Sequence, residues 1–286
     1  MRRGYIITKY TDSGQSYTVS RLLDEARKAS LGLTAVGVYD SIVDGAGRVM
    51  ASGRPVEPCD VAVNRYKWGH VSRAIASLAH RQYNSERAFT RYVDKYSQLL
   101  DISSPAMRLP RFVVGTAADP ERAFQRVREA VGGPPFVMKT LNRSMGQEVF
   151  LVATPVDFRR IACTFAPEKE WLFEEFIASS RGRDLRLMAI RGEAVACMER
   201  RSATDFRSNV ALGASVAGVP VTDELRRIAA DVYRCTGIDV AGIDLLFGRD
   251  SLVFCEVNVM PGLEGIESAS GVNVAGAVVS MINSDL

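Results

Sequence analysis

The chain near its end reads Val240-Ala-Gly-Ile-Asp-Leu-Leu-Phe247 and, after a short turn, Leu252-Val-Phe-Cys-Glu-Val-Asn258. Both runs are short and mostly apolar, which predicts the two strands of a hairpin. Successive side chains of a strand point to opposite faces. The polar groups of Asp244, Glu256 and Asn258 all fall on even positions, so we expect them on one face.

A three-residue loop at 248–250 would pair Phe247 with Ser251 and bring Asp244 opposite Phe254. Two carboxylates and an amide in apolar surroundings cannot stay unpaired without a large cost in free energy. Oxygen ligands of this kind suit Mg²⁺, which usually accompanies bound phosphates. An edge hairpin whose polar face simply contacts water fits the same spacing, so the hairpin alone leaves both interpretations open.

Composition limits the class of protein. The 286 residues are enough for about two domains, and 36 basic against 33 acidic residues give a net charge of +3. That charge is too weak to indicate nucleic-acid or membrane binding. Five scattered cysteines, without a C-x-x-C pair, indicate reduced thiols in the cytoplasm and argue against a zinc site or a disulfide framework. The chain shows no signal peptide and no long apolar run, so we expect a cytoplasmic protein.

The first third of the chain alternates between strand and helix patterns. Strands are expected at 4–8, 34–40 and 59–64, with an amphipathic helix after the first, which predicts a βαβ unit in a parallel sheet. Ligands of such sheets collect at the carboxyl ends of the strands. Asn64 and Arg65 are therefore candidate binding residues, although solvated loop ends would look the same. A single helix is expected from residue 85 to 100.

The middle of the chain contains a strand that ends in Lys139, a polar loop at 142–148 and a further strand at 149–152. This order is typical of a flap that covers phosphates, and a plain hairpin loop is the alternative. A strand at 170–177 then precedes a hairpin formed by 184–190 and 193–199.

Several stretches taken together are more specific than any strand pattern. They are Glu174-Glu-Phe-Ile177, Arg181-Gly-Arg-Asp184, Arg207-Ser208-Asn209 within DFRSN, VAGIDLL and EVNVMPGLEGIE. With them the chain resembles the ATP-grasp superfamily, and within it the RimK-like ligases, over about residues 95–277. The resemblance implies an α/β ATP-grasp fold in three parts: a Rossmann-like domain (1–93), a small central lid (94–168) and a C-terminal antiparallel-sheet domain with the Mg²⁺ site (169–286).

The resemblance also implies roles for single residues. Lys95 and Lys139 match lysines that contact ATP phosphates, Asp184 matches an acid near the ribose, and Arg207, Ser208 and Asn209 match the loop near the γ-phosphate. Three of these residues are the expected catalytic groups: Arg207, Asn209 and Lys139. The adenine hinge is matched by Glu174, Glu175, Phe176 and Ile177. The Mg²⁺ ligands are matched by Asp244, Glu256 and Asn258. The expected substrate contacts are Asn64, Arg65, Arg200 and Arg201. The flap departs from the family pattern, because Arg143 and Glu148 stand where glycines are common.

The implied activity is that of an ATP-dependent carboxylate–amine ligase. It would attach glutamate or another amino acid to an amino group through an acyl phosphate, releasing ADP and phosphate. Two Mg²⁺ ions are expected, with Mn²⁺ able to substitute. The expected partners are a small amino acid and an amine acceptor, which can be a peptide or a carrier protein, and a homodimer or homotetramer would be in keeping with the family. Two alternatives stay open: an ATP-binding regulatory or scaffold protein, and a ligase for an amino acid bound to a carrier protein.

Overall fold

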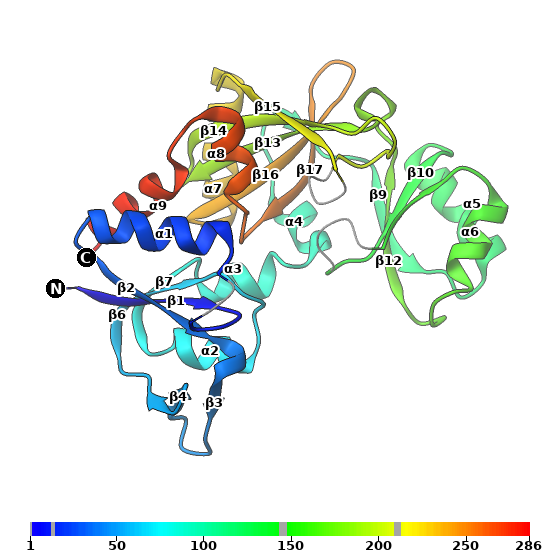
Figure 1. Ribbon diagram of the computed structural model, residues 1–286. Coiled ribbons are helices and arrows are strands. Elements are labelled where there is room, and N and C mark those ends of the chain that lie inside the picture. Colours follow the sequence, from blue (N-terminus) through cyan, green and yellow to red (C-terminus); the bar gives the residue numbers. More distant parts are fainter. Residues whose placement is uncertain (1, 13–14, 143–147, 209–212) are drawn as a thin grey trace.

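The computed structural model describes residues 2–12, 15–142, 148–208 and 213–286, and four sheets organise them. A parallel sheet lies at the end of the molecule that holds both termini, a six-stranded sheet lies in the middle, and a four-stranded antiparallel sheet lies at the far end (Figure 1). This is the expected α/β architecture: the sheet near the termini is parallel, the far sheet is antiparallel, and the central sheet is antiparallel except for one edge strand. Asn209 and the flap residues Arg143, Ser144 and Gly146 lie outside the described residues.

The parallel sheet has the order β2 (Gly32–Gly37), β1 (Arg3–Thr8), β6 (Cys59–Asn64) and β7 (Ala79–Tyr83). Successive side chains of β1 point to opposite faces of the sheet, and each face packs against its own helix. Ile6 packs in a cluster with α1 (Tyr17–Lys28), while Ile7 packs in another with α2 (His70–Ala76). The βαβ prediction is therefore confirmed. A small sheet of β3 (Ser41–Val43), β4 (Val49–Ala51) and β5 (Arg54–Pro55) follows β2 and a short 3₁₀ turn, η1 (Val38–Asp40).

The helix expected from 85 to 100 is two helices, so that prediction is wrong. The chain forms α3 (Glu86–Arg91) and α4 (Lys95–Asp101). Asp94 begins the second helix, because its side chain accepts a hydrogen bond from the Ser97 backbone N–H at 2.7 Å. An aspartate in this position satisfies a donor of the first helical turn and sets a new helix start. The interruption places Lys95 at the beginning of α4.

The far sheet has the order β11 (Val149–Val152), β10 (Phe136–Lys139), β12 (Glu170–Glu175) and β9 (Phe112–Thr116). Helices α5 (Pro120–Val131) and α6 (Pro155–Ala162) cover one face of it through an aromatic core that includes Phe124, Phe136 and Phe158. The expected three-part division of the chain stays a prediction. β12 lies after the expected boundary at residue 169, but it pairs with β10 and β9, which lie before that boundary.

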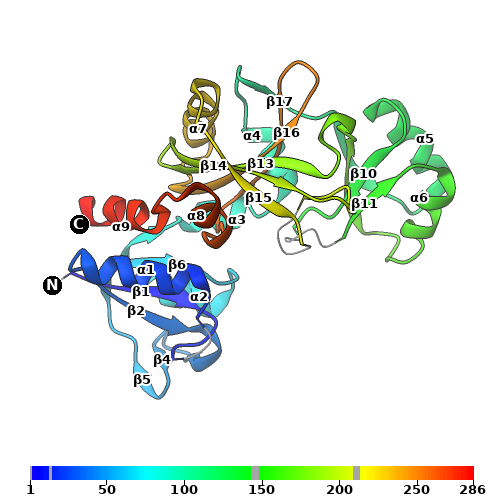
Figure 2. The ribbon, with the colours of Figure 1, turned by 45° about the horizontal axis from the view of Figure 1, so that its top comes forward.

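The central sheet has six strands. Its order is β15 (Ser215–Val219), β14 (Glu193–Arg201), β13 (Arg183–Ile190), β16 (Val240–Phe247), β17 (Leu252–Asn258) and β8 (Met107–Arg108). Helix α7 (Asp223–Thr236) packs on one face, and α8 (Glu264–Ser270) and α9 (Val274–Ser284) pack toward α1 (Figure 2). A short 3₁₀ turn, η2 (Ala178–Ser180), joins β12 to β13.

The predicted register of the last hairpin is wrong. Phe247 pairs with Leu252, not Ser251, so four residues form the loop. The register then shifts, with Leu245 opposite Phe254 and Asp244 opposite Glu256. One extra residue, Cys255, lies between the two pairings, which is a β-bulge. The bulge sets the two carboxylates directly across from each other.

No single described helix is long and apolar enough to cross a membrane, although α8 and α9 meet that test as a pair bent by 112°.

Candidate functional site

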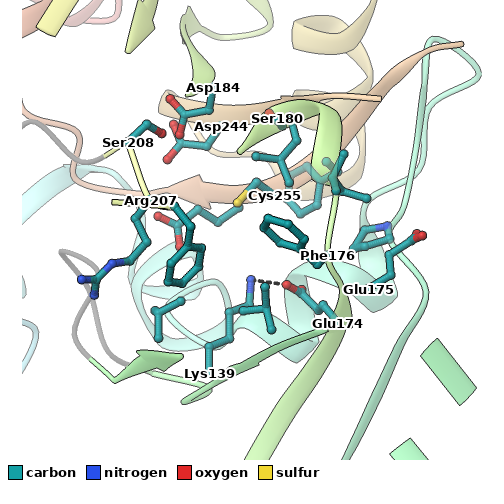
Figure 3. Close-up of a pocket in the computed structure, with 18 of the residues that line it drawn as sticks. Lys139, Glu174, Glu175, Phe176, Ser180, Asp184, Arg207, Ser208, Asp244 and Cys255 are labelled. Atoms are coloured by element: carbon teal, nitrogen blue, oxygen red, sulfur yellow. Dashed lines mark ion pairs between the residues drawn. The ribbon is translucent and has the colours of Figure 1, made fainter. Parts of the chain in front are cut away.

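A cleft of about 920 Å³ lies between the far sheet and the central sheet. Figure 3 shows side chains of both sheets turned toward it. Those that line it include Lys95, Val137, Lys139, Glu174, Phe176, Ile177, Asp184, Phe206, Arg207, Ser208, Asp244, Leu246, Cys255 and Glu256. The fold therefore brings residues that are far apart in the sequence to one cleft.

The two hairpin carboxylates and the amide converge at the central-sheet side of the cleft. Asn258 Nδ2 donates to Asp244 Oδ2 at 3.4 Å and lies 3.3 Å from Glu256 Oε1. Asp244 is buried, whereas the Glu256 side chain is 27% exposed. The three predicted metal ligands are thus within reach of one another, and Glu256 keeps access to the cleft.

Asp244 is also held by two arginines, which sequence reasoning did not anticipate. Arg186 pairs with both of its oxygens through Nε and, at 2.8 Å, through Nη2. Arg200 Nη2 lies 3.0 Å from Oδ2. Burial alone would raise the pKa of Asp244, but the two guanidinium groups outweigh it and hold that pKa below its usual value. Asp244 therefore stays ionised, as a metal ligand must.

Two lysines line the cleft. Lys139 Nζ lies 2.7 Å from Glu174 Oε2, and Lys95 Nζ lies 3.8 Å from Glu256 Oε2. Burial would lower the pKa of Lys139, but Glu174 reverses that effect and raises it. Burial lowers the pKa of Lys95, and Glu256 offsets this only in part. The cleft thus presents two ammonium groups suited to phosphate oxygens.

The predicted hinge crosses the end of the cleft beside Phe176 (Figure 3). Glu175 points away from the cleft and pairs with Arg108 and, at 3.3 Å, with Arg111. Glu174 points inward, and its Oε1 is buried without a hydrogen-bond partner among the described residues. A buried acceptor of this kind requires a donor. A ligand with N–H groups, such as adenine, would supply one.

Arg207, Ser208 and Asp184 also reach the cleft, but their present partners belong to the protein. Arg207 Nη2 lies 2.7 Å from Asp205 Oδ2, and its guanidinium points outward in Figure 3. Asp184 is paired with Arg200 at 2.7 and 2.6 Å. Burial raises the pKa of Asp184, although Arg200 and the Ser208 hydroxyl act against that.

The expected substrate residues are not gathered in one place. Asn64 and Arg65 line a second cavity of about 340 Å³, between the parallel sheet and residues such as Val240 and Leu263. Arg65 Nη2 donates to the Pro261 carbonyl at 2.7 Å. The Arg201 side chain is 61% exposed and pairs with Glu199, whereas Arg200 is buried against Asp184 and Asp244. None of these four residues is among those that line the cleft between the two sheets.

Sequence reasoning missed Arg186, which holds Asp244, and Cys255, which lines the cleft. Arg186 stands two positions after Asp184 on β13, and this spacing already puts both on one face. Cys255 enters the cleft because of the bulge, and burial raises the pKa of its thiol. Alternation along β13 could have placed Arg186 on the face of Asp184, although not its contact with Asp244. The position of Cys255 could not have been found in this way, because it depends on the bulge.

The donor set decides which ion the site fits. Among the described residues, no group of three or more His, Cys, Asp or Glu side chains is arranged to hold a metal. The candidate set is instead two carboxylates and an amide, all oxygen donors, beside two lysines. Such a set fits a hard cation that keeps several ligands from water and phosphate, as Mg²⁺ does. Asp244, Glu256 and Asn258 would hold it.

Comparison with known proteins places this cleft in a family. The sequence model of the RimK-like ATP-grasp domain matches residues 96–282. The chain belongs to the RimK-like ATP-grasp family. Members of this family are ATP-grasp ligases, and so is this enzyme.

Relatives in the family cover nearly the whole chain. A probable alpha-L-glutamate ligase from Enterobacter sp. (strain 638) is 31% identical over 282 residues, covering 94% of this chain and 92% of that one. One with the same description from Methanococcoides burtonii is 31% identical over 281 residues, with the same coverage of 94% and 92%.

Solved structures share the ATP-grasp fold. The ATP-grasp ligase PsnB, complexed with a minimal precursor, superimposes with a TM-score of 0.73 at 14% identity, covering 99% of both chains. The same ligase complexed with a phosphomimetic precursor variant, Mg and ADP gives a TM-score of 0.71 at 15% identity, covering 98% of this chain and 97% of that one. At these identities the likeness shows the fold alone, and the predicted ATP-grasp fold is confirmed.

Proposed function

We propose that this ATP-grasp ligase joins a carboxylate to an amino group through an acyl phosphate, with glutamate as the first amino acid to test. The cleft between the two sheets carries the proposal. It combines two buried lysines, a partly exposed acid that lines the cleft, Glu256, and a buried acceptor in the predicted hinge, Glu174. The relatives described as probable alpha-L-glutamate ligases, at 31% identity over 94% of the chain, support the choice of glutamate.

The chemistry requires little from protein nucleophiles. A carboxylate oxygen of one substrate attacks the γ-phosphorus of ATP, and ADP leaves. The amine of the other substrate attacks the acyl carbon, loses a proton and expels phosphate. Lys95 and Lys139 would orient the phosphates, and Arg207 would hold the equatorial oxygens if it left Asp205. Positioning and charge stabilisation would then provide the rate.

Mg²⁺ is the proposed cofactor, in one or two ions held by Asp244, Glu256 and Asn258. The metal would neutralise charge on the phosphates. The PsnB structure solved with Mg and ADP supports this assignment for the fold. Mn²⁺ is proposed as a substitute because it accepts the same oxygen ligands.

The acceptor is proposed to be a small molecule or a peptide, and the protein is proposed to be cytoplasmic. A peptide acceptor is supported by the PsnB complexes with precursor peptides. The scattered cysteines support a reducing compartment. A homodimer or homotetramer remains our proposal for the assembly, and neither nucleic acid nor membrane is a proposed partner, given the near-balanced charge.

Substrate-dependent nucleotide turnover tests the proposal. A thermal-shift screen of amino acids with Mg²⁺ and a non-hydrolysable ATP analogue would first identify candidate substrates. ADP and phosphate should then appear only when a carboxylate and an amine substrate are both present. Release of AMP and pyrophosphate would contradict the proposal. The Glu256→Gln variant should keep the thermal melting profile of the wild type but lose turnover, and near-normal turnover would remove Glu256 from the metal site.

A further inference from the structure

One face of the central sheet carries charged side chains on four neighbouring strands, and each of its two arginines stands opposite an acid. Arg200 on β14 is directly opposite Asp184 on β13, and Arg186 on β13 is directly opposite Asp244 on β16. Glu256 on β17 is opposite Asp244. Paired residues of adjacent antiparallel strands share a face, so these five side chains lie in one layer against the cleft.

Arg200 reaches over its neighbouring strand. Its Nε donates to Asp184 Oδ1 at 2.7 Å and its Nη2 to Asp184 Oδ2 at 2.6 Å, which is a two-point contact. The same Nη2 lies 3.0 Å from Asp244 Oδ2, two strands away in the sheet. The side chain is 6% exposed. One guanidinium therefore ties two buried carboxylates of different strands together.

The donors on Asp244 can be counted. A carboxylate offers about four lone-pair sites. Arg186 takes one on each oxygen and Arg200 takes the second on Oδ2, where Asn258 Nδ2 also donates at the longer distance of 3.4 Å. One site on Oδ1 is left over, on a carboxylate whose rotation is blocked from two directions. A ligand fixed in this way costs less to order when it binds a cation.

We propose that Arg200 is a positioning residue that orients Asp244 as a one-oxygen metal ligand, and that it does not bind the substrate. This inference rests on the proposed function, because it takes Asp244 as a ligand of Mg²⁺. It replaces the expectation from family resemblance that Arg200 contacts an acceptor carboxylate. All three described contacts of its guanidinium go to acids of the protein itself.

The role depends on the shape of the guanidinium as well as on its charge. Arginine presents donors in a rigid planar fork, whereas a lysine ammonium is a single point at the end of a flexible chain. A lysine at position 200 could approach Asp184 or Asp244 but would not fix the orientation of both. Arg200→Lys should therefore behave as a defective variant although its charge is kept.

The affinity for Mn²⁺, measured by electron paramagnetic resonance with a non-hydrolysable ATP analogue, tests the proposal directly. Loss of a residue that orients a metal ligand typically weakens metal binding by about 10–100-fold, so we expect a loss in that range for Arg200→Gln and a smaller one for Arg200→Lys. Arg201→Gln is the matched control for Mn²⁺ affinity, since this neighbouring side chain is 61% exposed and contacts Glu199. Its Mn²⁺ affinity should equal that of the wild type.

A second variant separates positioning from folding. Arg200→Gln leaves Asp184 buried without its partner and can destabilise the protein for that reason alone. Asp184→Asn combined with Arg200→Gln removes both charges, while Arg186 still holds Asp244. We expect the double variant to regain most of the lost thermal stability but to keep the weakened Mn²⁺ affinity. Recovery of Mn²⁺ affinity along with stability would overturn the proposal.

Kinetics at saturating metal provide the remaining contrast. With enough Mg²⁺, the KM of Arg200→Lys for the amino acid should match the wild-type value, because Arg200 does not touch that substrate. A large rise in this KM with unchanged Mn²⁺ affinity would overturn the proposal and restore the substrate-binding role, while the ligase assignment would stand. Absence of Mn²⁺ binding in the wild type itself would overturn the proposed metal site as well.

Discussion

Single charged residues of the cleft are paired within the protein, and this pairing has consequences for stability. Lys139 and Glu174 form a contact of 2.7 Å with side chains only 6% and 8% exposed. Removing one partner of such a pair leaves an uncompensated buried charge, whereas replacing both by apolar groups is often nearly neutral. Lys139 therefore contributes to stability through this pair, separately from the nucleotide contact that we propose for it.

Lys139→Met should lower the free energy of unfolding by about 3–5 kcal/mol, because Glu174 is left buried without its ion-pair partner. Lys139→Met combined with Glu174→Leu should regain most of that loss. Both variants should lose affinity for a non-hydrolysable ATP analogue, since both lack the ammonium group. Urea denaturation and calorimetric titration check the two effects. A single variant as stable as the wild type would show that the pair is not buried in solution.

The sequence predicts site residues better than it predicts their contacts. Alternation along the hairpin puts Asp244, Glu256 and Asn258 on one face, and they do converge. It could not predict that Asp244 would meet Arg186 and Arg200, because those arginines arrive from other strands of the sheet. Side-chain partners across strands depend on the order of strands, which no local pattern contains.

Among the elements, β16 shows how closely backbone and side chains pack around the site. Gly242 lies two residues before Asp244. A Cβ at position 242 would lie 2.8 Å from Pro261 Cβ and 3.3 Å from Arg186 Nη1. The absence of a side chain here makes room for both the arginine that holds Asp244 and the loop that follows Asn258.

Gly242→Ala should reduce both Mn²⁺ affinity and turnover, because Arg186 or Pro261 must move. Overpacking of this kind costs about 1–3 kcal/mol of stability. Gly115→Ala is the matched control, since Gly115 is also in a strand, β9, and a Cβ there would meet nothing within 4 Å. Mn²⁺ titration and thermal melting of both variants test this. If Gly242→Ala binds Mn²⁺ as the wild type does, Arg186 is not held in place by this packing.

Elements with strong periodic patterns were predicted well, and those with mixed patterns were not. Leu225, Ile228 and Val232 recur at helical spacing between Thr222 and Gly237, which predicts a helix there. That helix is α7, and Thr222 accepts from the Leu225 backbone N–H at 3.3 Å. β7 was missed because Ala79-His-Arg-Gln-Tyr83 is largely polar, and its position in the sheet comes from parallel pairing with β6. The bulge at Cys255 was missed because a one-residue shift leaves no mark on composition.

At the scale of the whole molecule, α1 fastens the parallel-sheet end to the segment that follows the hairpin. Arg21 Nε lies 3.1 Å from Glu267 Oε2, and the Tyr17 hydroxyl donates to the same oxygen at 2.9 Å. The Leu263 backbone N–H donates to Thr18 Oγ1 at 3.0 Å. These contacts connect the first helix to Leu263 and to α8, which follow Asn258 closely in the chain.

Glu25 makes this end of the molecule sensitive to acid. Lys28 and Asn273, with Arg21, lower the pKa of Glu25 from 4.5 to about 2. A carboxylate with a lowered folded-state pKa adds stability that is fully present above pH 4.5 and is lost as the pH falls toward about 2. Glu25→Gln should therefore be less stable at neutral pH and lose less stability between these two values. Urea midpoints at several pH values check this, and parallel curves for both proteins would contradict it.

The most direct measurement of the central claim follows oxygen from the substrate to the phosphate. The substrate carboxylate is labelled with ¹⁸O on both oxygens, and the phosphate released with ADP is examined by ³¹P NMR or mass spectrometry. An acyl phosphate requires one labelled oxygen in each phosphate, because the amine expels the oxygen that had attacked the γ-phosphorus. Unlabelled phosphate, or label found in AMP, would contradict the account.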